Sequence, residues 1–316
     1  MRICLMIEGQ ENVTWKHWRR LAIAAETAGF EALFRSDHYI SVMGQEDRGS
    51  HDAWATICAL APLTERIRLG TMVSPATFRH PSVLAKMVVT ADHASDGRVE
   101  LGLGAGWQER EHAAYGFPFA PLRERMDVLA EQLEIMHGQW TQSPFAFSGR
   151  HYEIASADHL PKPVQRPHPP LIMGGQAKAR SAELAARWAD EYNTVFASAE
   201  ICAERRAAIR AACEAAGRDP DTVTFSLMTG MAIGAEPADV ERRAAEIAEW
   251  TGGGSADTAV AALREQNCIV GTVEETLDQL RALEAVGVER IMLQHLNHWD
   301  LEVLELIGRE IIPAMA

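Results

Sequence analysis

Residues 3–38 read ICLMIEGQENVTWKHWRRLAIAAETAGFEALFRSDH and contain one complete strand–helix–strand unit. The apolar run Ile3–Ile7 predicts a strand that is buried on both faces. Thr14 can cap the helix that follows, and Gly29 is placed to end it. The segment 32–34 then predicts a second strand, which ends at Ser-Asp-His.

The same alternation of strands and helices continues along the chain. The other predicted strands span residues 67–73, 99–103, 171–173, 192–195, 223–228 and 290–293. The other predicted helices span residues 52–63, 82–93, 179–188, 199–216, 238–250, 273–286 and 301–311. Continuous apolar strands indicate a parallel sheet. Eight of them fit an α/β fold of the closed (β/α)8 TIM-barrel type better than two doubly wound halves.

Two segments interrupt this alternation and are expected to be insertions. Residues 140–170 follow the fourth strand, are rich in Pro, Ser and His, and contain a candidate hairpin around Gly149. Residues 251–266 lie in the seventh strand–helix region and include three consecutive glycines. We therefore expect a single barrel domain over residues 1–316, with the surplus length in these two loops.

The composition excludes several classes of partner. The chain carries 30 basic and 44 acidic residues, a net charge of −14, with no block of Lys and Arg. Nucleic acid and anionic membranes require a positive face, so we expect no partner of either kind. No segment has the roughly 20 apolar residues of a membrane span. Five scattered cysteines without C-x-x-C spacing indicate a reducing, cytoplasmic location rather than a disulfide framework.

In a barrel of this kind the functional groups lie at the carboxyl ends of the strands. His38 follows the second strand, where it would either move protons near neutral pH or be bonded into a structural loop. Glycines at 104 and 106 would let a flat or bulky group approach the backbone. The segment 174–176 is either an anion site with free amides or a plain tight turn.

Several familiar motifs are missing. The glycines of LGLGAG, residues 101–106, lack G-x-G-x-x-G spacing and follow the fourth strand, so a Rossmann site is disfavoured. There is no H-E-x-x-H or first-strand H-x-H, and His295 and His298 follow the last strand only three residues apart. We therefore expect no metal site. No G-x-S-x-G elbow indicates a serine hydrolase.

The residues resemble those of the bacterial luciferase-like monooxygenases. The resemblance rests on segments in the right order, residues 68–81, 84–86, 96–107, 111–116, 124–125, 169–175 and 185–190, and it continues weakly to the end of the chain. It implies a barrel that binds either reduced FMN or the deazaflavin coenzyme F420. Glu111-His112, Tyr115-Gly116 and Phe119 are similar to the F420-dependent subgroup, so the resemblance favours F420, with FMN as the alternative.

The resemblance also implies roles for individual residues. The coenzyme ring would lie on a bulge after the third strand, formed by a non-proline cis peptide at Met72–Val73. His38 would be the catalytic residue and assist proton movement beside the ring. The implied cofactor-binding residues are Asp37, His38, Met72, Val73, Ser74, Gly104, Ala105, Gly106, Gly174, Gly175 and Gln176. Among them, Gly104 and Gly106 would admit the ring, and the amides at Gly174 and Gly175 would meet the phosphate region, helped by Lys178 or Arg180.

The sequence departs from part of this family. Some F420-dependent sugar dehydrogenases have a Trp where Val42 stands and a catalytic Glu where Trp107 stands, which disfavours a sugar-phosphate substrate. We expect Glu111 to pair with an arginine such as Arg125, and Glu8 to face the substrate. The expected function is hydride transfer between F420 and a small organic molecule. The alternatives are an FMNH2-dependent monooxygenase and a binding module without catalysis. The resemblance implies a homodimer and, for FMN, a separate cofactor reductase.

Overall fold

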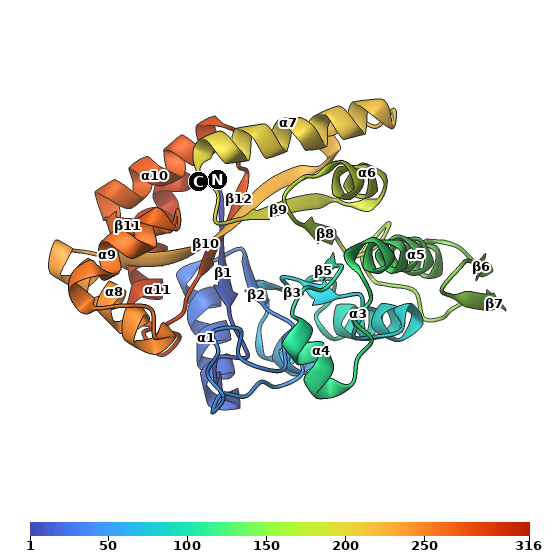
Figure 1. Cartoon of the computed structure of the whole chain (residues 1–316), viewed down its shortest axis with the longest axis horizontal. Coiled ribbons are helices and arrows are strands. Elements are labelled where there is room, and N and C mark those ends of the chain that lie inside the picture. Colours follow the sequence, from blue (N-terminus) through green and yellow to red (C-terminus); the bar gives the residue numbers. More distant parts are fainter.

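The computed structural model describes all 316 residues and contains a closed barrel of eight parallel strands surrounded by helices (Figure 1). The barrel strands are β1 (Arg2–Ile7), β2 (Ala32–Arg35), β3 (Arg68–Thr71), β5 (Val99–Gly104), β8 (Leu171–Gly174), β9 (Glu191–Val195), β10 (Thr224–Gly234) and β12 (Arg290–Gln294). They pair in this order, and β10 pairs with both β9 and β12. Pairing of β12 with β1 closes the ring. The predicted TIM-barrel fold is confirmed.

The helices begin and end where local signals predict. In α1 (Trp15–Ala28), the hydroxyl of Thr14 accepts a hydrogen bond from the His17 amide at 3.3 Å. Gly29 ends the helix with φ +88°, a conformation that glycine adopts without strain. The other helices that cover the strands are α2 (Ala53–Leu60), α3 (Pro81–Ala94), α5 (Leu122–Thr141), α6 (Ala179–Trp188), α7 (Ala199–Ala215), α10 (Val273–Ala285) and α11 (Glu302–Leu306).

Side chains alternate between the inside and the outside of the barrel, as the twofold period of a strand requires. The outward residues of β1, such as Leu5 and Ile7, join the large core cluster beneath the helices. The inward residues form a separate apolar cluster in the barrel interior, namely Cys4, Met6, Ala32, Phe34, Met72, Ile172, Met228 and Met292. By the same period, Glu8 after β1 and Gln294 in β12 lie on the inner side, one layer above Met6 and Met292.

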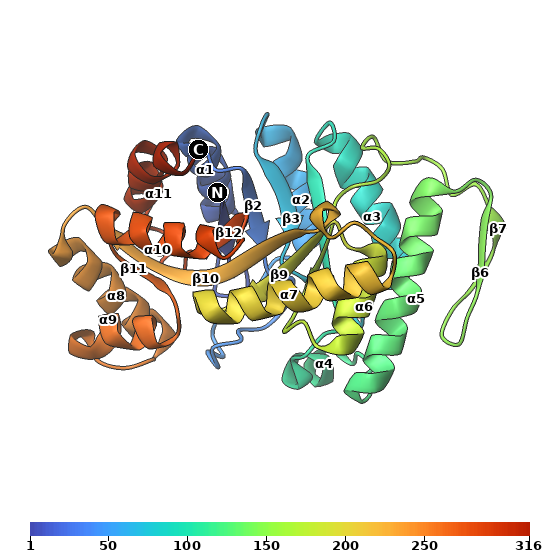
Figure 2. The same ribbon diagram turned by 90° about the horizontal axis from the view of Figure 1, so that it is seen from above.

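The structure corrects the second predicted insertion. Residues 256–265 form a helix, α9 (Ala256–Glu265), which packs against α8 (Pro237–Thr251). A short strand, β11 (Ile269–Thr272), follows and pairs with the end of β10, so the region has its own apolar cluster. Only residues 252–255 between the two helices are irregular. The α8–α9 pair lies at one end of the molecule (Figures 1 and 2).

The first predicted insertion contains the expected hairpin, β6 (Phe145–Ser148) and β7 (Glu153–Ala157), which projects from the barrel in both views (Figures 1 and 2). Two helices, α4 (Glu109–Tyr115) and α5, precede it, and no helix was expected there. The first residue lies near the end of the chain, since the Met1 amino group donates to the Met315 carbonyl at 2.7 Å. No helix is both long and apolar enough to cross a bilayer.

Candidate functional site

His38 is held by a carboxylate that the sequence did not connect with it. Its Nδ1 lies 2.8 Å from Oε2 of Glu111 in α4, which packs at the same end of the barrel as the loop after β2 (Figure 1). The other carboxylate oxygen of Glu111 accepts hydrogen bonds from the Tyr39 and Ile40 amides. Glu111 is fully buried, and both of its carboxyl oxygens take part in these contacts. It therefore fixes both the backbone after His38 and the orientation of the imidazole ring.

The pairing changes the acid–base properties of His38. Burial disfavours the charged imidazolium, but the hydrogen bond and charge of Glu111 outweigh it and raise the pKa of His38 above its ordinary value. Because Nδ1 faces the carboxylate, a neutral His38 carries its proton there and leaves Nε2 as the basic nitrogen. The expected pairing of Glu111 with Arg125 was wrong, since the Arg125 guanidinium lies over the Phe119 ring at 3.9 Å.

Asp37 lies behind the site instead of facing it. It is 1% exposed, and its carboxylate accepts hydrogen bonds from Arg79 and, at 2.7 Å, from the Ser74 hydroxyl. The Trp54 indole in turn donates to the Ser74 hydroxyl at 3.0 Å. Arg79 also binds Asp52, so it lies between two carboxylates, which raise its pKa despite burial. This buried network ties the loop after β2 to the backbone that follows Met72–Val73.

Met72–Val73 is a non-proline cis peptide, as the resemblance implied. It separates β3 from β4 (Ser74–Pro75), which pairs with β5. A Cβ built at Gly102 would clash with the Thr71 carbonyl oxygen, at 2.1 Å, so glycine is required there, and a Cβ at Gly104 would lie 2.9 Å from a Val73 methyl group, which would have to shift. The space left by Gly104 is thus filled by Val73 instead of being open to a ligand. Gly106, at φ +78°, forms a turn beside Thr77.

In the segment 174–176 after β8, the structure shows which backbone amides are free to bind an anion and which are not. The Gly175 amide donates to the Asn193 carbonyl at 3.0 Å, so this amide is not free to bind a phosphate. The Ala177 amide is not free either, because it donates to the Tyr192 hydroxyl at 2.8 Å. The open amides belong to the first turn of α6, where Lys178 supplies no side-chain cap.

The cationic side chains near this turn differ in their availability. Arg180 is bonded to Asp127 and to the Arg123 carbonyl, whereas Lys178 is exposed and forms no ion pair. Gln176 is also exposed, and Ala105 is half-buried between the two glycines at the end of β5. Of the two expected cations, only Lys178 is therefore free to meet an anion.

The opposite side of the barrel mouth is polar. Glu8 is 8% exposed, and its two carboxylate oxygens accept hydrogen bonds from the side-chain amides of Gln10 at 2.6 Å and Gln294 at 2.5 Å. Ser36 orients the Gln10 amide by donating to its carbonyl oxygen. The barrel mouth therefore has a glycine side at β5 and β8 and a polar side at β12, β1 and β2.

Trp107 lies beside His38. Its side chain is 63% exposed, and its ring meets the His38 ring edge-on at 5.7 Å. Of the predicted site residues, the strand ends bring His38, the Met72–Val73 bulge and the glycines to one end of the barrel. Glu111 was assigned to the wrong partner, and Gln10 and Gln294 were not predicted. All three reach the site through tertiary contacts, which the sequence does not show. No group of three or more His, Cys, Asp or Glu side chains is placed to hold a metal ion.

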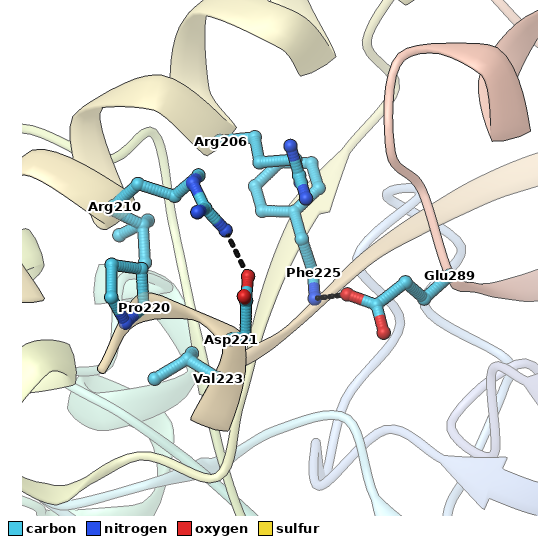
Figure 3. Close-up of a pocket in the computed structure, with 8 residues that line it drawn as sticks. Arg206, Arg210, Pro220, Asp221, Val223, Phe225 and Glu289 are labelled. Atoms are coloured by element: carbon cyan, nitrogen blue, oxygen red, sulfur yellow. Dashed lines mark hydrogen bonds and ion pairs between the residues drawn. The ribbon is translucent and has the colours of Figure 1, made fainter.

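A separate cavity of about 220 Å³ lies at the other end of the barrel (Figure 3). Phe225 and Glu289 lie at the amino-terminal ends of β10 and β12, and the Phe225 amide donates to Glu289 at 3.3 Å. Arg210 of α7 pairs with Asp221 across the cavity, as Figure 3 shows. The cavity is therefore remote from His38 and takes no part in the site described above.

Comparisons with known proteins agree with this arrangement. A family model described as luciferase-like monooxygenase matches residues 3–290. An FMNH2-dependent dimethylsulfone monooxygenase of Pseudomonas putida is 27% identical over 96% of this chain and 89% of its own length. The chain also resembles an F420-dependent secondary alcohol dehydrogenase solved with an F420–acetone adduct, at a TM-score of 0.84 and 20% identity, covering 100% of this chain and 99% of that one.

A third likeness is to the oxygenating constituent of 3,6-diketocamphane monooxygenase of Pseudomonas putida, solved with FMN. The TM-score is 0.81 at 20% identity, covering 99% of this chain and 98% of that one. At such identities, structural likeness supports the fold and leaves the choice between the two cofactors open.

Proposed function

Because this chain belongs to the luciferase-like monooxygenase family, we propose that it is an oxidoreductase that transfers a hydride between coenzyme F420 and a small organic substrate. The observation that carries the proposal is the His38–Glu111 pair at the same end of the barrel as the Met72–Val73 cis peptide. F420, when bound, donates or accepts the hydride. The protein supplies the position and the proton chemistry.

The glycine side of the barrel mouth suits a flat ring. Val73 fills the space at Gly102 and Gly104, and it leaves a smooth apolar bulge without a charged side chain. Met72, Val73 and Ala105 would support the ring there. The first turn of α6, with Lys178 beside it, would meet the anionic tail, because open amides and a free cation both favour negative charge. Asp37 and Ser74, buried behind the bulge, would position it.

His38 would balance the charge that moves with the hydride. When an alcohol carbon of the substrate loses a hydride, its hydroxyl proton passes to Nε2 of His38, and the carbonyl forms. In the reverse direction, Nε2 returns this proton to the carbonyl oxygen. Glu111 stabilises the imidazolium in both directions through Nδ1, and Trp107 excludes water from one edge of the ring.

A second candidate is an FMNH2-dependent monooxygenase. The observation in its favour is the similarity over nearly the whole chain to an FMNH2-dependent monooxygenase. In that case a separate reductase would supply the reduced FMN, and molecular oxygen would be the oxidant. The same residues would hold the ring, and His38 would move a proton to or from the oxygenated substrate.

Incubation with each reduced cofactor in air distinguishes these functions. Reduced F420 is nearly inert to oxygen, so we expect it to be consumed only when a carbonyl substrate is added, without oxygen uptake. Oxygen uptake with reduced FMN, coupled to formation of an oxygenated product, would instead support the monooxygenase. If neither cofactor reacts or binds, the protein is not an oxidoreductase of either type.

A further inference from the structure

The residues on either side of His38 are both bonded to one guanidinium, that of Arg79. Its Nη1 and Nη2 donate to the two carboxylate oxygens of Asp37 at 2.5 and 3.1 Å. Nη2 also donates to the Tyr39 hydroxyl at 3.1 Å, and this hydroxyl donates to Asp52 at 2.9 Å. The residue before His38 and the residue after it are therefore tethered to the same group.

The carboxylate of Asp37 also reaches the bulge after β3. It accepts a hydrogen bond from the Ser74 hydroxyl at 2.7 Å, and Ser74 directly follows Met72–Val73. Asp37 is 1% exposed and Ser74 is 0% exposed, so bulk water does not compete for this bond. Asp37 thus joins the loop that carries His38 to the backbone that is proposed to support the ring.

Arg79 is itself held from two directions. The side-chain amide of Gln132 in α5 donates to the Arg79 carbonyl at 3.1 Å and to the Ala76 carbonyl at 2.7 Å. The guanidinium pairs with Asp52, the residue that caps α2, at 2.6 Å. Only 7% of the Arg79 side chain is exposed. Its position is therefore fixed relative to two helices of the barrel.

The contacts of Arg79 require an arginine. A planar guanidinium can bind a carboxylate through two nitrogens and still reach further acceptors, whereas a lysine ammonium is a single point charge. The Arg35 guanidinium also interacts with Asp37 through its charge, but its hydrogen bonds go to other residues. Arg79 is therefore the cation that bonds directly to Asp37.

We infer that Arg79 is a positioning residue, which holds the His38 loop and the bulge after β3 in register with each other through Asp37. The inference rests on the proposed function, because it assumes that the cofactor ring lies on this bulge. Arg79 takes no part in proton transfer itself. Its replacement should accordingly weaken cofactor binding and slow turnover together, whereas the replacement of His38 mainly slows turnover.

The test measures F420 affinity by fluorescence titration and stability by urea unfolding in the same variants. Arg79→Lys keeps the charge and loses the two-pronged contact, so F420 affinity should fall by about tenfold, the weight of one hydrogen bond to a charged group. Asp37→Asn should have the same effect. The double variant should also lose about tenfold instead of a hundredfold, because both changes break one linkage.

Arg243→Lys is the matched control. Arg243 is another buried arginine, and it pairs with Asp300 at 2.7 Å, away from the residues next to His38. Its replacement should lower the free energy of unfolding and leave F420 affinity unchanged. With F420 saturating and a carbonyl substrate, Arg79→Lys should lower kcat by about 10²-fold and change KM little, because a small misplacement of a catalytic group has this effect.

Wild-type F420 affinity in Arg79→Lys would overturn the inference, even if the stability of this variant falls as in the control. A hundredfold loss in the double variant would overturn it as well, because Arg79 and Asp37 would then act independently. If Arg79→Lys does not fold, wild-type affinity in Asp37→Asn overturns the inference in the same way. Failure of the wild-type protein to bind F420 contradicts the proposed function itself, and the same variants are then titrated with FMN, with the same outcomes.

Discussion

At the scale of single residues, Glu111 determines which nitrogen of His38 is available for chemistry. The carboxylate holds Nδ1 at 2.8 Å and leaves Nε2 free to accept or donate a proton. Replacing His38 with Asn should therefore lower turnover by about 10²–10⁴-fold, the usual contribution of a general acid or base. Cofactor affinity should fall far less than turnover, which a fluorescence titration of the variant checks. Unchanged turnover would contradict the role of His38.

Glu111 acts through His38, so its replacement should have a distinct signature. Glu111→Gln removes the charge that raises the pKa of His38, so this pKa should fall. In the direction that uses His38 as a base, the acidic limb of kcat/KM against pH should move to lower pH. The rate at the optimum should also fall by about 10–100-fold, because the ring loses its fixed orientation.

Glu109→Gln is the matched control for this prediction. Glu109 lies two residues before Glu111 in the same helix, but it is exposed and forms no hydrogen bond or ion pair with His38. Its replacement should leave the pH profile unchanged. A profile for Glu111→Gln that matches the wild-type profile would show that the carboxylate only supports the backbone at Tyr39 and Ile40.

Residue types at strand ends were predictable, but their partners were not. His38 and Met72–Val73 follow strands and match a recognisable motif, so the sequence identified them. Glu111 is 73 positions from His38, and the sequence contains no local signal that joins them. The expected partner, Arg125, was nearer in the chain, but its guanidinium lies over the Phe119 ring and forms no ion pair with Glu111.

At the scale of elements, the bulge between β3 and β4 depends on glycines in the neighbouring strand. Gly104→Ala would place a Cβ 2.9 Å from a Val73 methyl group. We expect Val73 to be displaced, with a loss of about 1–3 kcal/mol in the free energy of unfolding and weaker F420 binding. Gly49→Ala is the control, because a Cβ there meets nothing within 4 Å. Equal melting temperatures and equal F420 affinities for both variants would contradict this account of the bulge.

The elements that were predicted best have regularly spaced apolar residues and also residues that mark where the element begins and ends. The helix over residues 15–28 has a threonine cap and a terminal glycine, and its predicted bounds are those of α1. The helix α9 was not predicted, because the three consecutive glycines before it are typical of a loop. In the structure these glycines only connect α8 to α9. The long helix α5 buries Arg125, Gln132 and Gln139 along with its apolar residues, so its apolar period is interrupted.

At the scale of the whole molecule, the two ends of the barrel are built differently. The mouth holds the site, whereas the opposite end is closed by Arg290, which donates to Glu31, Glu100 and Glu191. Arg290, Glu100 and Glu191 lie on the inner side of their strands and are buried, whereas Glu31 precedes β2 and is half-buried. Without Arg290, Glu31 would keep Arg2 and Glu100 would keep Arg68, but the buried Glu191 would lose its one ion pair and Glu100 would lose one of two.

Arg290→Met should therefore destabilise the fold by about 3–5 kcal/mol at neutral pH, measured by urea unfolding. Without the arginine, the pKa of Glu100 rises from its lowered value, so the carboxyl is neutralised as the pH falls. The difference from the wild-type protein should accordingly shrink at lower pH. Arg309→Met, which breaks an exposed pair with Glu310, should cost no more than about 0.5 kcal/mol. A loss of stability that does not depend on pH would contradict this account.

The most direct test of the whole account is a fluorescence titration of F420 with the wild-type protein. The net charge of −14 would repel an anionic coenzyme, so binding must depend on local groups such as the first turn of α6. We predict saturable binding at one site per chain, with an affinity in the micromolar range or better and only a modest dependence on salt. Absence of binding at low and high salt alike would contradict the claim that this barrel is an F420-dependent oxidoreductase.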